Sequence, residues 1–122
     1  MATKFVDTVY ATVQSTDAAG NVAYTVTLPD ESITMFVVNT VARTSGGTSA
    51  SYIRAGGWSR EAGGGATLVG GAFTSVHARE DDSGWDQQTF AVTGNDVQIK
   101  VVGKAATTID WFLEIHIVQY VP

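Results

Sequence analysis

Cysteine is absent from the chain of 122 residues, which excludes disulfide bonds, thiolate metal ligands and a cysteine nucleophile. Charged residues make up only 16 %, below the roughly 25 % that is usual for soluble domains. No apolar run approaches the ~20 residues that a membrane-spanning helix needs, and no apolar segment of a secretory signal opens the chain. Seven basic against twelve acidic residues give a net charge of −5, which argues against nucleic acid and anionic membranes as partners.

β-Branched residues and glycine are abundant instead. Val and Thr are the commonest residues, and there are 13 glycines but only 2 prolines. Hydrophobic residues recur with a period of two, and no segment sustains a helical period. Turn-forming clusters separate about eight predicted strands, which span 4–14, 21–28, 33–43, 49–60, 66–78, 86–93, 96–103 and 107–120. The sequence therefore predicts one all-β domain over 1–122, an antiparallel, jelly-roll-like β-sandwich, with a closed barrel as the alternative.

Two of these strands are apolar on both faces, unlike the strands of an ordinary sandwich. In 107–120, Trp111 lies on the face expected to form the core, whereas Phe112 and Tyr120 lie on the other face. The segment 33–38, which contains Phe36, is also apolar on both faces. A single chain would expose such residues or cover them with loops. We expect identical subunits to cover one sheet face, with a trimer as the expected count and Phe36, Phe112 and Tyr120 as interface residues.

Aromatic and cationic side chains of the segment 49–60 share one parity, which places Tyr52, Arg54 and Trp58 on one strand face. Trp85 lies in another polar, glycine-containing segment. Sugar-binding surfaces combine exposed aromatic faces with polar and charged side chains, so these four residues are the candidate ligand surface. The alternative is that Trp58 and Trp85 belong to the core or to an interface.

Glu114 and His116 lie two residues apart and hence on the same strand face. Such a pair could be a base with its orienting group, or half of a metal site that takes a third ligand from His77 or Asp110. Neither histidine has a recognisable metal-ligand spacing, so a structural hydrogen bond or salt bridge is the favoured interpretation.

The densest acidic run is Glu80-Asp81-Asp82-Ser83-Gly84, with Asp86 close behind, and it could hold Ca²⁺. Asp, Ser and Gly also build ordinary turns, and the spaced ligand pattern of an EF-hand is missing. No Gly-x-Ser-x-Gly motif indicates a serine nucleophile. The glycine runs 63–65 and 70–71 lack the Lys-Ser/Thr of a phosphate-binding loop, and no cofactor is expected.

The order of turns and strands over about 25–121 resembles a β-sandwich module of tailed-bacteriophage virion proteins, often found at the carboxyl end of tail fibres. The segments that carry the resemblance are 51–54, 61–70, 80–86, 92–103 and 107–111.

This resemblance implies a non-enzymatic, commonly trimeric protein on the surface of the virion. We expect a capsid decoration or a fibre-like component whose partners are copies of itself and other virion proteins of the capsid or tail. The alternative is a receptor- or carbohydrate-binding module of a tail fibre, with a host-surface glycan as partner.

Overall fold

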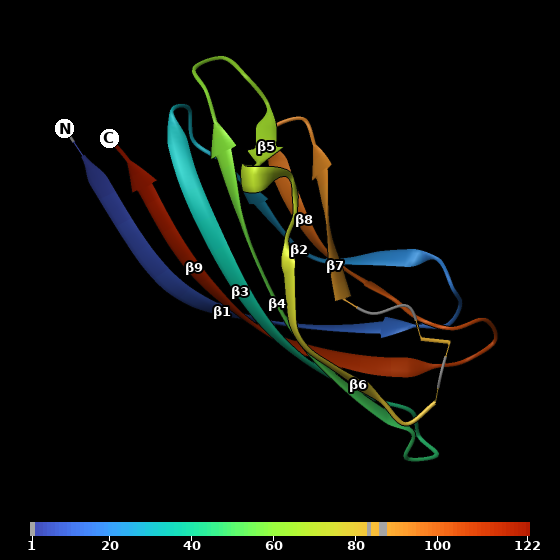
Figure 1. Ribbon diagram of the computed structural model, residues 1–122. Helices are drawn as coiled ribbons and strands as arrows, with labels where there is room; N and C mark the ends of the chain where they lie inside the picture. Colours follow the sequence, from blue (N-terminus) through green and yellow to red (C-terminus); the bar gives the residue numbers. More distant parts are fainter. Residues whose placement is uncertain (1, 83, 86–87) are drawn as a thin grey trace.

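The computed structural model describes residues 2–82, 84–85 and 88–122, and almost all of its regular structure is β (Figure 1). One short 3₁₀ turn, Val69–Gly71, is the exception, and no helix in the described part of the chain is long and apolar enough to span a bilayer. The strands in chain order are β1 (Thr3–Ser15), β2 (Gly20–Thr27), β3 (Ser32–Arg43), β4 (Ser49–Arg60), β5 (Ala66–Leu68), β6 (Thr74–Glu80), β7 (Gln88–Thr93), β8 (Asp96–Val102) and β9 (Ile109–Val121).

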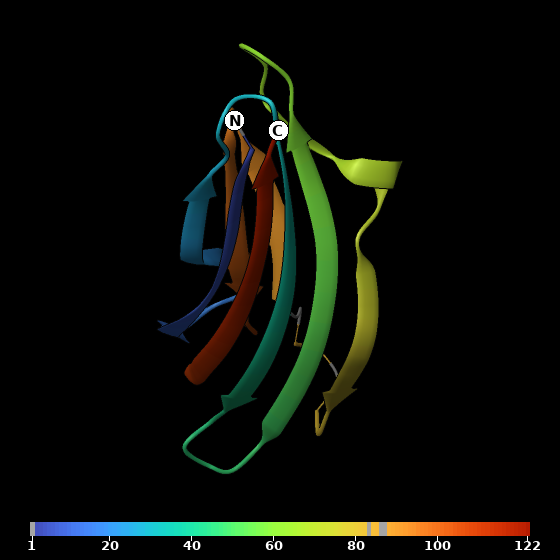
Figure 2. The same cartoon turned by 90° about the vertical axis from the view of Figure 1, so that its left-hand side faces the viewer.

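These strands form two antiparallel sheets that face each other. The larger sheet has the order β1-β9-β3-β4-β5, with β6 also paired to β4, and the smaller sheet has the order β2-β8-β7. Figure 2 shows β1, β9, β3, β4 and β6 side by side as long curved strands, with the smaller sheet behind them. The predicted all-β sandwich is confirmed, and the two separate sheets decide against the closed barrel.

The predicted strand 66–78 is two strands, because its paired glycines break it. Gly70 and Gly71 both have φ of +74°, a conformation that other residues rarely adopt, and they turn the chain between β5 and β6. Both of those strands pair with β4. Gly56, inside β4, has a different role: an ideal Cβ there would lie 2.8 Å from Cβ of Phe73 and 2.9 Å from the Trp58 ring. Gly56 thus allows β4 to pack closely against Phe73 and Trp58.

The core fills the space between the sheets with alternate residues of each strand. Trp58 contacts Phe36 and Phe90, with ring centroids 5.7 and 4.8 Å away. Trp111 is 2 % exposed, as the alternation predicted, and its Nε1–H donates a 2.8 Å hydrogen bond to Oγ of Ser15. The strands β3, β4 and β9 all bury alternate residues against the smaller sheet, so the intervening residues lie on the outer face of the larger sheet.

Candidate functional site

The residues predicted to form a ligand surface are buried. Tyr52, Arg54 and Trp58 do share one face of β4, as their parity required, but it is the inner face. Their exposed fractions are 1, 8 and 1 %, and that of Trp85 is 5 %. The alternation of residues along a strand shows which residues share a face, but it does not show which face points into the core. The prediction of an exposed ligand surface formed by Tyr52, Arg54, Trp58 and Trp85 is therefore wrong. These side chains pack in the core instead.

Arg54 is the unusual member of this group. Its guanidinium carbon lies 5.8 Å from the centre of the Tyr52 ring, and burial lowers its pKa while the charges of Tyr52 and Glu80 oppose that shift. Within the described residues, Nε of Arg54 has no hydrogen-bond partner. A buried cation in this state costs folding free energy and is not accessible to a ligand in solution.

The three predicted interface residues separate in the structure. Phe36 is fully buried between the sheets, so its assignment to a surface was wrong. The reason is that 33–38 is apolar on both faces, so periodicity could not distinguish Phe36 from its neighbours. Phe112 and Tyr120 lie on the outer face of the larger sheet and are 44 and 40 % exposed. Their place in an interface stays a prediction.

An apolar patch covers the end of this outer face that lies near the chain termini. The register places Val6 opposite Val118, Val118 opposite Met35, and Tyr120 opposite Ile33. These five side chains are between 39 and 76 % exposed and come from β1, β9 and β3. We call Val6, Ile33, Met35, Val118 and Tyr120 the terminal patch. The loops among the described residues leave the terminal patch exposed to solvent. The alternative interpretation, in which loops cover the apolar strand faces, does not hold for this patch.

A row of hydrogen-bonded polar side chains crosses the outer face beside the terminal patch. His116 Nε2 lies 2.7 Å from Oε1 of Glu114, and Nδ2 of Asn39 donates to the same oxygen at 3.1 Å. On the other side of the ring, Nδ1 of His116 lies 3.1 Å from Oγ1 of Thr8. These bonds from His116 and Asn39 hold the pKa of the Glu114 carboxyl below its ordinary value. We call Thr8, Asn39, Glu114 and His116 the polar row.

The polar row contains the structural hydrogen bond that the sequence favoured for Glu114 and His116. His77, the suggested third ligand, lies on β6 with its Nε2 2.8 Å from Oγ of Ser51. Asp110 accepts a hydrogen bond from Gln14 at the other end of β9. Among the described residues no cluster of three His, Asp or Glu side chains is placed to hold a metal ion.

The lowered pKa of Glu114 has a consequence in acid. A carboxyl group whose pKa is lower in the folded than in the unfolded state stabilises the fold at pH values above its unfolded-state pKa. That contribution is lost as the pH falls through the folded-state pKa. We expect Glu114→Gln to lose less stability than the wild type between pH 7 and pH 3, measured by urea unfolding. The control is Glu61→Gln, in the exposed turn after β4, which should follow the wild type. If Glu114→Gln and the wild type lost equal unfolding free energy between pH 7 and pH 3, the lowered pKa of Glu114 would be contradicted.

The acidic run near residue 80 has partners of its own. Asp82 forms a 2.7 Å salt bridge with Lys104, and Oδ2 of Asp81 accepts the backbone N–H of Ser49 at 3.0 Å. These contacts tie the end of β6 to the start of β4 and to the segment between β8 and β9. Ser83 and Asp86, which the calcium interpretation included, lie outside the described residues.

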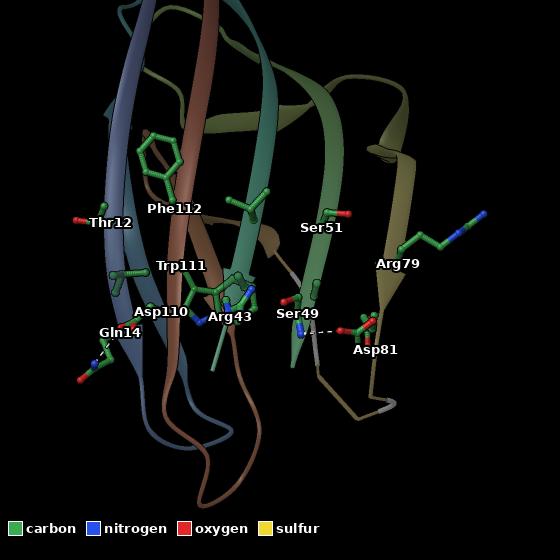
Figure 3. Close-up of a pocket in the computed structure, with 15 residues that line it drawn as sticks. Thr12, Gln14, Arg43, Ser49, Ser51, Arg79, Asp81, Asp110, Trp111 and Phe112 are labelled. Carbon is green, nitrogen blue, oxygen red and sulfur yellow. Dashed lines mark hydrogen bonds between the residues drawn. The ribbon is translucent and has the colours of Figure 1, made fainter. Parts of the chain in front are cut away.

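Beyond the polar row, the outer face holds a groove of about 1030 Å³ that crosses β1, β9, β3, β4 and β6. Figure 3 places Phe112 toward one end and Gln14, Arg43, Ser49 and Asp81 across the other, while Arg79 extends outward at the β6 edge. A second hollow of about 420 Å³ adjoins it and shares some of its lining. The side chains that line both are Val41, Ser51 and Phe112. The groove could not be predicted from the sequence, because it joins five strands whose register was unknown.

Solved structures of low similarity to this chain include two phage tailspike proteins. One is the tailspike protein gp49 of Acinetobacter baumannii bacteriophage Fri1, a capsular polysaccharide depolymerase, with 10 % identity and a TM-score of 0.45 over 93 % of this chain. The other is the tailspike protein of Acinetobacter phage vB_ApiP_P1, with 13 % identity and a TM-score of 0.44 over 88 %. This chain covers 17 and 20 % of their lengths. No protein-family model matches the sequence, and no curated protein matches it.

Both similar structures are phage tailspike proteins. They do not address whether this chain is a capsid decoration or a fibre component. The expectation of a non-enzymatic protein is contradicted, because the gp49 tailspike is a capsular polysaccharide depolymerase. Resemblance to virion proteins does not exclude catalysis, and a match to about a fifth of that enzyme assigns no activity to this chain.

Proposed function

We propose that the chain is a surface module of a phage virion, a capsid decoration or a fibre-like component, that assembles with copies of itself through the terminal patch. The phage resemblance of the turn and strand order supports the virion setting. The exposed apolar surface of the larger sheet supports the self-association, with a trimer as the expected count.

The single observation that carries this proposal is the terminal patch. Val6, Val118 and Met35 lie side by side across the sheet. Val6 is 76 % exposed, and Met35 and Val118 are 46 and 45 % exposed. Contiguous apolar surface of this kind marks an interaction site, since monomeric proteins rarely leave it open. Phe5, on the opposite face of β1, is also 44 % exposed, because this end of β1 lies away from the smaller sheet (Figure 1).

Self-association buries this surface and is driven by the hydrophobic effect, at about 25 cal/mol per Å² of apolar area removed from water. Exposure of both faces at the start of β1 supports a partner that contacts this edge as well as the terminal patch. Closed rotational symmetry would leave the opposite ends of the subunits free for the capsid or tail protein.

The test compares two valines of equal exposure on different sheets. Val118→Asp places a charge in the terminal patch and should reduce the particle mass, measured by light scattering after size exclusion, to the 12.9 kDa of one chain. Val22→Asp is the matched control, because Val22 is also 45 % exposed but lies on β2 of the smaller sheet. Its mass should equal that of the wild type.

Circular dichroism and thermal unfolding of both variants establish that the fold is kept. A folded Val118→Asp protein with the same oligomeric mass as the wild type would refute the terminal patch as the interface.

A further inference from the structure

The two edges of the larger sheet differ in how regularly they are built. β1 forms one edge (Figure 2), and within the described residues it pairs with β9 alone, through 13 residues without a register shift. At the opposite edge β5 has only three residues, and the pairing of β6 with β4 shifts register between Ile53 and Arg54. A long edge strand without a bulge or a proline is a template on which another strand can pair. β1 is the edge of this kind.

One hydrogen bond shows which backbone groups of β1 point away from β9. The N–H of Thr8 donates to Oδ1 of Asp7 at 2.8 Å, which places this N–H at the free edge of the strand. In an antiparallel ladder, the backbone groups of alternate residues point to the same side. The free edge therefore carries the N–H and C=O groups of Thr8 and of the residues that share its parity. These residues are Lys4, Val6, Tyr10, Thr12 and Gln14.

The outer face of β1 is symmetric about Thr8. Val6 lies two residues before Thr8 and Tyr10 lies two residues after it, and these are the two most exposed large apolar side chains of the strand. When two copies of β1 pair antiparallel with Thr8 opposite Thr8, each Val6 lies opposite a Tyr10. Pairs of an aromatic with a β-branched side chain, and pairs of two threonines, stabilise a sheet. The strand is thus complementary to a second copy of itself.

Asp7 opposes this pairing in two ways. Its carboxylate occupies the N–H of Thr8, which a carbonyl group of the second strand would need. In the register centred on Thr8, the Asp7 residues of the two strands are diagonal neighbours on one face, about 7–8 Å apart, so their charges repel each other. Charged side chains on edge strands protect natural sheets from such pairing.

We propose that the free edge of β1 is a docking edge for a second copy of this chain, in antiparallel register about Thr8, and that the Asp7 carboxylate holds this edge closed. The contact differs from self-association through the terminal patch, because it joins backbone groups and does not need the outer face of β3 or β9. Removal of the Asp7 carboxylate opens the edge, and two chains then share one continuous sheet.

The test is made in the Val118→Asp protein, so that assembly through the terminal patch does not obscure the edge contact. Adding Asp7→Ala should double the mass of this protein, measured by light scattering after size exclusion over a range of concentrations. The matched control is Asp17→Ala. Asp17 is also exposed and also accepts a backbone N–H at 2.8 Å, from Ala19, but it lies in the turn after β1. The control removes the same charge and should leave the mass unchanged.

Proline at position 8 distinguishes edge pairing from any other contact between chains. Thr8→Pro, added to Asp7→Ala, removes the N–H at the free edge and should return the mass to that of the Val118→Asp protein. The pairing with β9 does not use this N–H, so the sheet is kept, which circular dichroism checks. Thr8→Ala in place of the proline keeps the N–H and should keep the doubled mass. It controls for the loss of the hydroxyl group that faces His116.

Amide hydrogen exchange locates the contact along β1. In the doubled particle the N–H groups of Val6, Thr8 and Tyr10 should exchange at least about tenfold more slowly than in the Val118→Asp protein. The N–H groups of Phe5 and Val9 point toward β9 and should change little. This alternation along the strand is the signature of pairing at the free edge.

Four results would overturn the inference. They are a mass that Asp7→Ala leaves unchanged, a doubling that Asp17→Ala also produces, a doubling that Thr8→Pro does not reverse, and a doubled particle in which Val6 and Tyr10 exchange as before. Failure of the proposed function is seen separately, in the mass of the wild type and of Val118→Asp alone. If Val118→Asp remains oligomeric, the terminal patch is refuted, while the ratio of the masses with and without Asp7→Ala still tests the edge.

Discussion

Trp58→Ala is expected to lower the free energy of unfolding by about 3–5 kcal/mol. Trp58 is 1 % exposed, and its ring packs between Phe36 and Phe90 at the centre of the space between the sheets. Truncation removes the largest of the fully buried side chains and leaves a cavity that the rigid sheets cannot close. Urea unfolding followed by tryptophan fluorescence and circular dichroism measures the loss.

The matched control for Trp58 is an aromatic residue at the surface. Tyr10→Ala removes a ring that is 63 % exposed and stacks on Phe112 at the surface, so it should cost less than about 1.5 kcal/mol. A Trp58→Ala protein as stable as the wild type would contradict the burial of this residue and return it to the ligand surface that the sequence suggested.

Gly103→Ala is the second substitution with a large expected effect. An ideal Cβ at Gly103 would overlap Oγ of Ser15 and lie 3.0 Å from the carbonyl oxygen of Asp17. Ser15 accepts the hydrogen bond from Nε1–H of Trp111, and both side chains are buried. Displacing Ser15 therefore adds overpacking and leaves the indole N–H of Trp111 without its acceptor. We expect a loss of about 2–4 kcal/mol.

Gly46→Ala tests whether this loss is specific to the position. Gly46 lies in the turn between β3 and β4, and the nearest atom to its ideal Cβ is Oγ1 of Thr44 at 3.8 Å. The unfolding free energy of the Gly46→Ala protein should stay within about 0.5 kcal/mol of that of the wild type. Ser15→Ala should reproduce part of the Gly103→Ala loss, since it removes the same acceptor. A Gly103→Ala protein of unchanged stability would show that the chain at Gly103 moves aside freely.

Strand positions followed from the sequence because alternation and turn residues are local signals. The segment 49–60 matches β4 at both ends, and 33–43 differs from β3 by one residue. Which face of a strand points into the core, by contrast, depends on the tertiary structure. In β4 the face opposite Trp58 carries small residues such as Ser49 and Ser51, and that contrast could have identified the face of Trp58 as the inner one.

The candidate sites depended on register as well as on alternation. Phe112 and Tyr120 could be placed on a second apolar face of one strand, because that face is visible within 107–120 alone. The terminal patch needed the pairing of Val118 with Val6 and Met35, which joins residues more than 80 positions apart. The same is true of the groove, where Arg43 and Asp110 meet only in the folded sheet.

The most direct test of the account is the mass of the purified wild-type protein in solution, measured by light scattering after size exclusion over a range of concentrations. Self-association through the terminal patch predicts a discrete oligomer, expected at three times the 12.9 kDa of one chain. A stable species of 12.9 kDa at every concentration would contradict it, because the terminal patch would then remain open to water.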